Sequence, residues 1–145
     1  MEWALEVIVL PVADLDRAKA FYEDKLDFKL DTDHREGEHF RVVQLTPRGS
    51  HCSISMLKGG PGGGVTSQAP VKGLHLVVSD IELAHAELLD RGAPVSDVFH
   101  FEAGGPAPGP HPERSDYGSY MSFEDPDGNG WLVQEVGREG PDLAA

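Results

Sequence analysis

Two stretches decide the fold: LPVADLDRAKA at residues 10–20 and LVVSDIELAHA at residues 76–86 repeat each other at an offset of 66 residues. The repeat keeps a leucine, a valine, an aspartate and two alanines at matching places. Each copy has the pattern of an apolar strand followed by an aspartate and a helix. An internal repeat of this kind indicates two similar structural modules within one chain.

The aspartate in each copy, Asp14 or Asp80, stands where a helix is expected to begin. A carboxylate at that place accepts a hydrogen bond from an amide of the first helical turn. Apolar residues then recur at helical spacing, as Leu15, Ala18, Tyr22 and Leu26 in the first module and as Ile81, Ala84 and Leu88 in the second. We interpret both stripes as core faces.

Three strands are expected after each helix. In the first module they cover residues 28–33, 39–46 and 52–58, and in the second residues 94–100, 119–124 and 130–136. We therefore predict a single domain over residues 1–137, made of module 1 (1–58) and module 2 (71–137). A glycine-rich connector (59–70) joins the modules, residues 138–145 form a tail, and the glycine- and proline-rich residues 103–110 form a loop.

Composition narrows the classes of function. The 145 residues include 12 Lys and Arg against 25 Asp and Glu, a formal net charge of −13. This balance argues against nucleic acid and anionic membranes as partners, because both attract clusters of basic residues. No apolar run approaches the roughly 20 residues that span a bilayer. With a single cysteine, Cys52, and no basic segment at the start of the sequence, we expect a cytoplasmic protein.

The stretch LPVADLDRAKAFY at residues 10–22, together with DPDGN at residues 125–129 before the last strand, resembles the vicinal oxygen chelate superfamily. This superfamily includes glyoxalase I, extradiol dioxygenases and bleomycin-binding resistance proteins. The resemblance implies an α+β fold in which two tandem strand-helix-strand-strand-strand modules form a half-open mixed β-barrel. The helices lie outside and the modules form a cup on the other face. Because many members dimerise, we expect a homodimer.

Enzymes of this superfamily hold a divalent metal with His, Gln or Glu side chains in the middle of these strands. By the resemblance, the ligand positions fall on Val7, on Gly73, near Ser55 and on Leu132. Alkyl groups and glycine donate no lone pair, and a neutral serine is a poor ligand for a divalent ion. We therefore expect neither a metal site nor any other cofactor.

Strand alternation assigns side chains to the cup. Core residues at alternate positions leave a set of eight candidate ligand-binding residues: Val7, Val9, Ser55, His75, Tyr117, Tyr120, Leu132 and Gln134. Two of these assignments keep an alternative. His75 is either a ligand contact or a wall residue that hydrogen-bonds the backbone, and Tyr120 either contacts a ligand or fills the barrel. A shift of one residue in register would invert every assignment.

Three hypotheses of function follow. The first is a protein that binds a small, cationic, antibiotic-like molecule in the cup without chemistry. The second is a lyase, isomerase or dioxygenase that uses a displaced metal near His75 and Gln134, or metal-free acid-base catalysis by His75. A displaced metal would also need Glu124 or Glu135, and Glu135 is expected to point away from the cup. The third is an interaction domain with a filled cup. We expect His100 and His111 at the surface and Cys52 to be inert.

Overall fold

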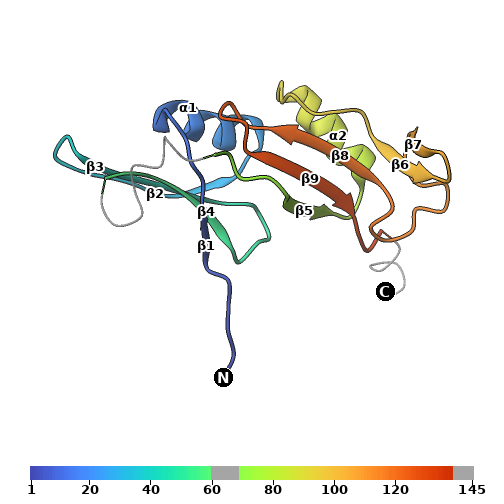
Figure 1. Cartoon of the computed structure of the whole chain (residues 1–145), viewed down its shortest axis with the longest axis horizontal. Coiled ribbons are helices and arrows are strands. Elements are labelled where there is room, and N and C mark those ends of the chain that lie inside the picture. The colour runs from blue at the N-terminus through green and yellow to red at the C-terminus, as the bar shows by residue number, and fades with distance from the viewer. Residues whose placement is uncertain (60–68, 139–145) are drawn as a thin grey trace. The chain divides into compact units, whose positions relative to one another are not determined.

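A computed structural model of the chain describes residues 1–59 and 69–138 and divides the chain into two compact units. Unit 1 comprises Met1–Val71 and Asp125–Asn129, and unit 2 comprises Lys72–Glu124 and Gly130–Ala145 as far as they are described (Figure 1). Residues 60–68 of the expected connector and residues 139–145 of the expected tail lie outside the described residues.

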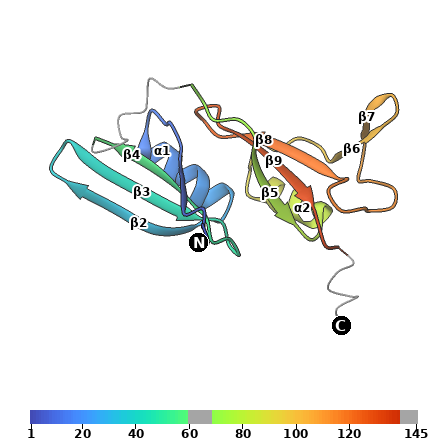
Figure 2. The same cartoon turned by 60° about the horizontal axis from the view of Figure 1, so that its bottom comes forward.

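Unit 1 has one four-stranded sheet in the order β1-β4-β3-β2 (Figure 2). β1 and β4 are parallel, and the other neighbours are antiparallel. Its elements are β1 (Val7–Val9), α1 (Leu15–Ala20), a π-helical turn η1 (Phe21–Lys25), β2 (Lys29–Glu36), β3 (Phe40–Thr46) and β4 (Ser53–Lys58).

Unit 2 repeats this plan with one more strand, in a five-stranded sheet of order β5-β9-β8-β6-β7. Its first and last strands, β5 and β9, are again parallel neighbours. Its elements are β5 (Leu74–Val78), α2 (Ile81–Asp90), β6 (Phe99–Glu102), β7 (Gly105–Pro108), β8 (Tyr120–Glu124) and β9 (Gly130–Glu135). The expected α+β class, with two mixed sheets and few helices, is confirmed.

Both helices begin where the aspartates predict. The Asp14 carboxylate accepts a hydrogen bond from the Arg17 amide at 3.1 Å, and the Asp80 carboxylate accepts one from the Leu83 amide at 3.1 Å. After α2 the chain reverses at Gly92, whose φ of 74° favours glycine. Neither α1 nor α2 has the length and apolar composition that crossing a membrane requires.

Apolar side chains fill the side of each sheet that faces its helix. In unit 1, α1 packs on β4, and the buried residues include Leu10, Val12, Tyr22, Val43, Leu45 and Met56. In unit 2, α2 packs on β8 and β9, and the buried residues include Leu74, Met121, Phe123, Trp131 and Val133. Strand alternation in the sequence predicts Met56, Trp131 and Val133 as core residues, and all three are buried.

The turn Asp125–Asn129 joins β8 to β9 but packs within unit 1. Its Asp125 carboxylate accepts a hydrogen bond from the Tyr22 hydroxyl at 2.6 Å. The fully buried Asn129 donates to the Pro11 carbonyl at 3.0 Å and accepts from the Val71 amide at 2.8 Å. These bonds explain why the DPDGN sequence needs its aspartate and asparagine.

Some predicted element boundaries were wrong. The strand expected at 94–100 begins only at Phe99, and Val95 contributes a single bridge to Phe123. Residues 105–108, expected within a loop, form β7, because an edge strand tolerates proline where no partner needs the amide. In unit 1, β2 continues to Glu36 because the chain turns at Gly37, which has a φ of 64°.

Candidate functional site

The face of the unit 2 sheet opposite α2, here called the open face, gathers four of the candidate ligand-binding positions and their neighbours. His75 on β5 lies opposite Leu132 on β9, and Val77 lies opposite Gln134. On the other side of β9, Tyr120 also lies opposite Gln134. Since residues paired in register share a face, these side chains lie on one side of the sheet. His75 and Val77 are exposed, whereas Gln134 is buried.

An aromatic cluster of Phe99, Phe101 and Tyr120 lies on the same open face. The Phe99 and Tyr120 rings are stacked with centroids 5.5 Å apart, and Phe101 meets Tyr120 edge to face at 5.3 Å. Phe101 is 55% exposed. Neither phenylalanine was predicted as a site residue. Phe101 lies beyond the predicted end of the strand at residue 100, and Phe99 lies within that strand but was assigned to neither face. The alternation in FHFE, residues 99–102, was the signal that could have found them.

His100 lies between these phenylalanines and points to the opposite face, where it is buried rather than at the surface as expected. Its Nδ1 lies 2.8 Å from the Gly109 carbonyl oxygen and its Nε2 lies 2.9 Å from a Glu102 carboxylate oxygen. Both neighbours accept hydrogen bonds, so both ring nitrogens are satisfied only in the protonated form. The pKa of His100 is raised mainly by its hydrogen bond to the Gly109 carbonyl and further by its hydrogen bond to Glu102.

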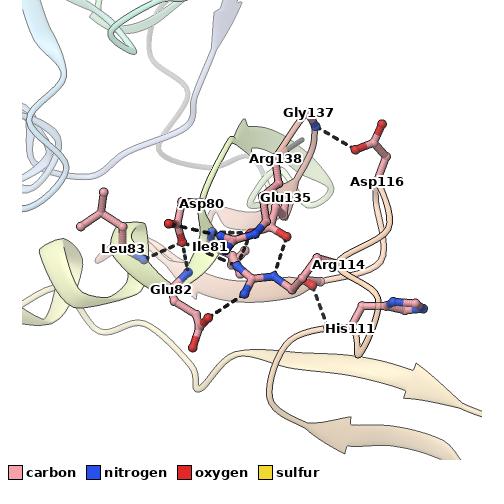
Figure 3. A network of polar contacts seen from close by, with 11 residues as sticks. Asp80, Ile81, Glu82, Leu83, His111, Arg114, Asp116, Glu135, Gly137 and Arg138 are labelled. Atoms are coloured by element: carbon pink, nitrogen blue, oxygen red, sulfur yellow. Dashed lines mark hydrogen bonds and ion pairs between the residues drawn. The ribbon is translucent and has the colours of Figure 1, made fainter. Parts of the chain in front are cut away.

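Tyr117 lies outside the strands, on the segment that leads into β8. Its backbone has a φ of 62°, a left-handed conformation that is uncommon for a residue with a side chain. Its amide donates to the Glu135 carbonyl at 2.8 Å, and the neighbouring Asp116 accepts from the Gly137 amide at 2.8 Å (Figure 3). The Tyr117 side chain is exposed. The fold thus holds the backbone of Tyr117 in place and leaves its ring accessible.

A buried ion pair fixes this segment to the rest of unit 2 (Figure 3). Glu135 is 1% exposed, and its two oxygens accept from Arg114 Nε at 2.8 Å and Nη2 at 2.6 Å. Arg114 also donates to Glu82, and Glu135 accepts from the Ile81 amide at 2.9 Å. The Arg114 guanidinium lowers the pKa of Glu135. As expected, Glu135 points toward α2 and away from the open face.

The open face of the unit 1 sheet brings together the remaining three candidates. Val7 lies opposite Ser53, and Val9 lies opposite Ser55. Both serines are buried, and the Ser53 hydroxyl lies 2.6 Å from that of Thr46. This face therefore presents small side chains, of which Val9 is the exposed one among the candidates.

The positions that the sequence resemblance assigns to metal ligands carry side chains that are poor donors to a divalent ion. Val7 and Leu132 have no donor atom, Gly73 has no side chain, and Ser55 has only a neutral hydroxyl. Within residues 1–59 and 69–138, no three His, Cys, Asp or Glu side chains converge as a metal site requires. The donors that the sequence does supply, His75 and Gln134, lie on neighbouring strands of one sheet.

The family model of the Glyoxalase/Bleomycin resistance protein/Dioxygenase superfamily matches residues 4–133, and the chain belongs to this superfamily. The resemblance seen in the sequence is thereby confirmed. No curated protein matches the chain in sequence.

Solved structures are similar over nearly the whole chain. TnmS3, an antibiotic binding protein from Streptomyces sp. CB03234, is 28% identical with a TM-score of 0.66, covering 93% of this chain and 97% of its own. A glyoxalase/bleomycin resistance protein from the same organism is 29% identical with a TM-score of 0.63, covering 91% of this chain and 100% of its own. A superfamily member from Sphaerobacter thermophilus DSM 20745, 23% identical with a TM-score of 0.66, covers 92% of this chain and 98% of its own and shows the shared fold alone.

Proposed function

We propose that this protein binds a small, aromatic, cationic molecule of the antibiotic class, without a metal and without converting it chemically. The likeness to an antibiotic binding protein over almost the full length of both chains supports the class of ligand. The proposal places the main contact surface on the open face of unit 2.

The aromatic cluster is the observation that carries this proposal. Stacked and edge-to-face rings form a rigid apolar surface on which a planar ligand can stack without the ordering of flexible side chains. Phe101 stays more than half exposed although the cluster holds it in a defined contact with Tyr120. An exposed phenylalanine held in place in this way is suited to contact a ligand.

Polar groups beside the cluster would orient the ligand. His75 and Gln134 share the open face with Tyr120, and Tyr117 presents a phenol from the held segment. Small-molecule sites commonly combine an apolar surface with a few such polar groups. The net charge of −13 adds a long-range attraction for a cation, which salt weakens.

The candidate contacts in unit 1 stay predictions. Val7, Val9 and Ser55 are predicted contacts from unit 1, and residues 1–137 are predicted to act as one domain. We also propose that the protein works as a homodimer in the cytoplasm.

The proposal excludes a metal because the side chains at the expected ligand positions are poor donors to a divalent ion. The alternative, a lyase, isomerase or dioxygenase, would rely on His75, the one candidate acid or base on the open face that the sequence analysis singled out. Metal analysis of protein purified without chelator separates the two. A stoichiometric divalent ion that is lost in a His75→Ala variant would contradict the proposal.

Calorimetry with metal-stripped protein tests ligand binding. The titrants are bleomycin, doxorubicin and further cationic aromatic antibiotics. We expect at least one dissociation constant below about 1 mM, weakened about tenfold in Phe101→Ala, since a good aromatic contact contributes on the order of 1 kcal/mol. Leu89→Ala, an exposed apolar residue on α2, is the matched control and should bind like the wild type. If no titrant binds more tightly than about 1 mM, or if the two variants bind alike, the proposal fails.

A further inference from the structure

The open face of unit 2 carries a carboxylate, Glu124, at the end of β8. Glu124 lies opposite Gly130 of β9. Its neighbour Phe123 is buried on the α2 side, so strand alternation turns the Glu124 side chain to the open face, where it is exposed. The other two carboxylates in the described strands of unit 2, those of Glu102 and Glu135, form hydrogen bonds on the opposite side. Among these strands, Glu124 alone places a negative charge on the open face.

Glu124 and the aromatic cluster lie at opposite ends of β8. Tyr120, whose ring stacks on that of Phe99, stands four residues earlier in the same strand. At about 3.3 Å per residue, the Cα atoms of Tyr120 and Glu124 are therefore about 13 Å apart. Ser122 lies between them on the same face and has a small side chain. The open face thus offers an aromatic surface at one end of the strand and a negative charge at the other.

Lys72 is a partner of Glu124 in the structure. Its Nζ lies 2.7 Å from Glu124 Oε2, and the two side chains are 59% and 62% exposed. The lysine chain passes over β9 at Gly130, where an added Cβ atom would lie 3.1 Å from Lys72 Cδ and crowd it. Exposed ion pairs of this kind contribute little to stability. A cationic group on a ligand can therefore replace Lys72 beside Glu124 at small cost.

We propose that Glu124 determines specificity by pairing with the cationic group of the ligand. The preferred ligands are elongated, with an aromatic ring system at one end and an ammonium or guanidinium group at the other. The rings stack on the aromatic cluster, and the cation takes the place of Lys72. This inference rests on the proposed function, because it needs a ligand bound on the cluster. Net charge attracts every cation, whereas Glu124 rewards only one at the right distance from the rings.

Calorimetry with three matched probes tests this spacing. The probes are naphthylhexylamine, naphthylhexanol and naphthylmethylamine, of which only the first carries a cation on a chain long enough to reach Glu124 from the cluster. The wild type should bind the hexylamine about threefold to fivefold more tightly than the hexanol, the modest gain expected of an exposed ion pair. Glu124→Gln should lower the affinity for the hexylamine to that for the hexanol. The affinities for the other two probes should not change.

Two further variants separate a direct contact from general electrostatics. Glu87→Gln removes the same charge at an exposed position on α2 and should leave all three affinities unchanged. Lys72→Met removes the competing cation and should tighten hexylamine binding about twofold to threefold. The double variant of Lys72→Met and Glu124→Gln should bind the hexylamine like Glu124→Gln alone, because the gain requires the carboxylate.

The possible results distinguish this inference from the proposed function. If Glu124→Gln binds the hexylamine like the wild type while Phe101→Ala weakens all three probes, the inference is overturned and the proposed function stands. Equal losses in Glu124→Gln and Glu87→Gln would indicate attraction by net charge and would also overturn it. If neither the probes nor the antibiotics bind more tightly than about 1 mM, the inference and the proposed function fail together.

Discussion

The two units share one plan of strands and helix. The helix sides of their two sheets are similar, whereas the open faces differ. On the helix side each unit has one largely buried arginine. Arg41 on β3 pairs with Asp16 and Asp33 in unit 1, and Arg114, on the segment between β7 and β8, pairs with Asp80, Glu82 and Glu135 in unit 2. The open faces have little in common: unit 1 presents serines and valines, and unit 2 presents the aromatic cluster.

The helix sides of the sheets stabilise the fold, whereas the open faces are the surfaces that can differ in ligand recognition. The helix sides must bury apolar residues and satisfy their charges, so different residues reach a similar solution. The open faces have no such requirement, and there the chemistry of the two modules diverges. Our proposal therefore assigns ligand recognition mainly to unit 2, and the following predictions test this contrast between the units.

The largest expected effect is a loss of stability at the buried ion pair of unit 2, which has a more exposed counterpart in unit 1. Arg114→Met leaves Glu135 buried without its partner and should lower the free energy of unfolding by about 3–5 kcal/mol. Arg41→Met should cost only about 1–2 kcal/mol, because Asp16 is 75% exposed and Asp33 keeps a contact with Lys19 at 2.9 Å. Urea unfolding of both variants measures the two costs. Equal losses of unfolding free energy would show that the two arginines contribute equally to stability.

Acid unfolding checks the same pair. The pKa of Glu135 is lowered in the folded state, so the stability it contributes is complete above its unfolded pKa of about 4.3 and is lost as pH falls through the folded value. The difference in stability between wild type and Arg114→Met should therefore shrink as the pH falls below about 4. A constant difference down to pH 2 would contradict the ion-pair account.

The turn that closes unit 1 should show the next effect. Tyr22→Phe removes the hydrogen bond to the buried Asp125 and should cost about 1.5–3 kcal/mol, the range for a bond to a charged group. Tyr117→Phe in unit 2 is the control. Because Tyr117 is 56% exposed, the unfolding free energy should change by less than about 0.5 kcal/mol. Chemical denaturation of the two variants compares them directly.

The open faces are compared by ligand affinity. Phe101→Ala should weaken binding of the tightest antibiotic in the calorimetric panel about tenfold, whereas Val9→Ala should weaken it less than about threefold. Both side chains are exposed, so neither change should disturb folding. A larger loss in Val9→Ala would move the centre of recognition to unit 1 and reverse the contrast.

The smallest effect concerns the β6–β7 hairpin that carries Phe99 and Phe101. Because the pKa of His100 is raised in the folded state, its contribution to stability is complete below about pH 6.5 and is lost as pH rises through the folded value. Thermal unfolding temperatures of the wild type should fall between pH 6.5 and 9 relative to those of His100→Gln. Parallel curves would show that His100 does not titrate in this range.

Much of the fold could be predicted from the sequence because local patterns and structure agree. The aspartates at 14 and 80 cap their helices, and alternation placed Trp131 and Val133 in the core. The DPDGN turn was identified as a motif, but its bonds to Tyr22 and Pro11 join residues more than 100 positions apart, so no local pattern revealed them.

The candidate site was harder to predict because its aromatic residues sit beside glycines and prolines. The edge strand β7 contains prolines, yet it pairs with β6 and extends the sheet to Phe101. A segment rich in glycine and proline usually indicates a loop. His100 was misplaced for the same reason, since an ordered strand sends it to the face opposite its two neighbours. Tertiary pairing decided both outcomes.

Chemical-shift mapping of the 15N-labelled, metal-stripped protein with the tightest antibiotic of the panel tests the central claim most directly. We predict that the largest shifts fall on the amides of residues 99–102 and 117–120 and on those of His75 and Gln134, and that Phe101→Ala reduces them at equal ligand concentration. Largest shifts confined to residues 7–9 and 53–57, or shifts that require an added divalent metal, would contradict it.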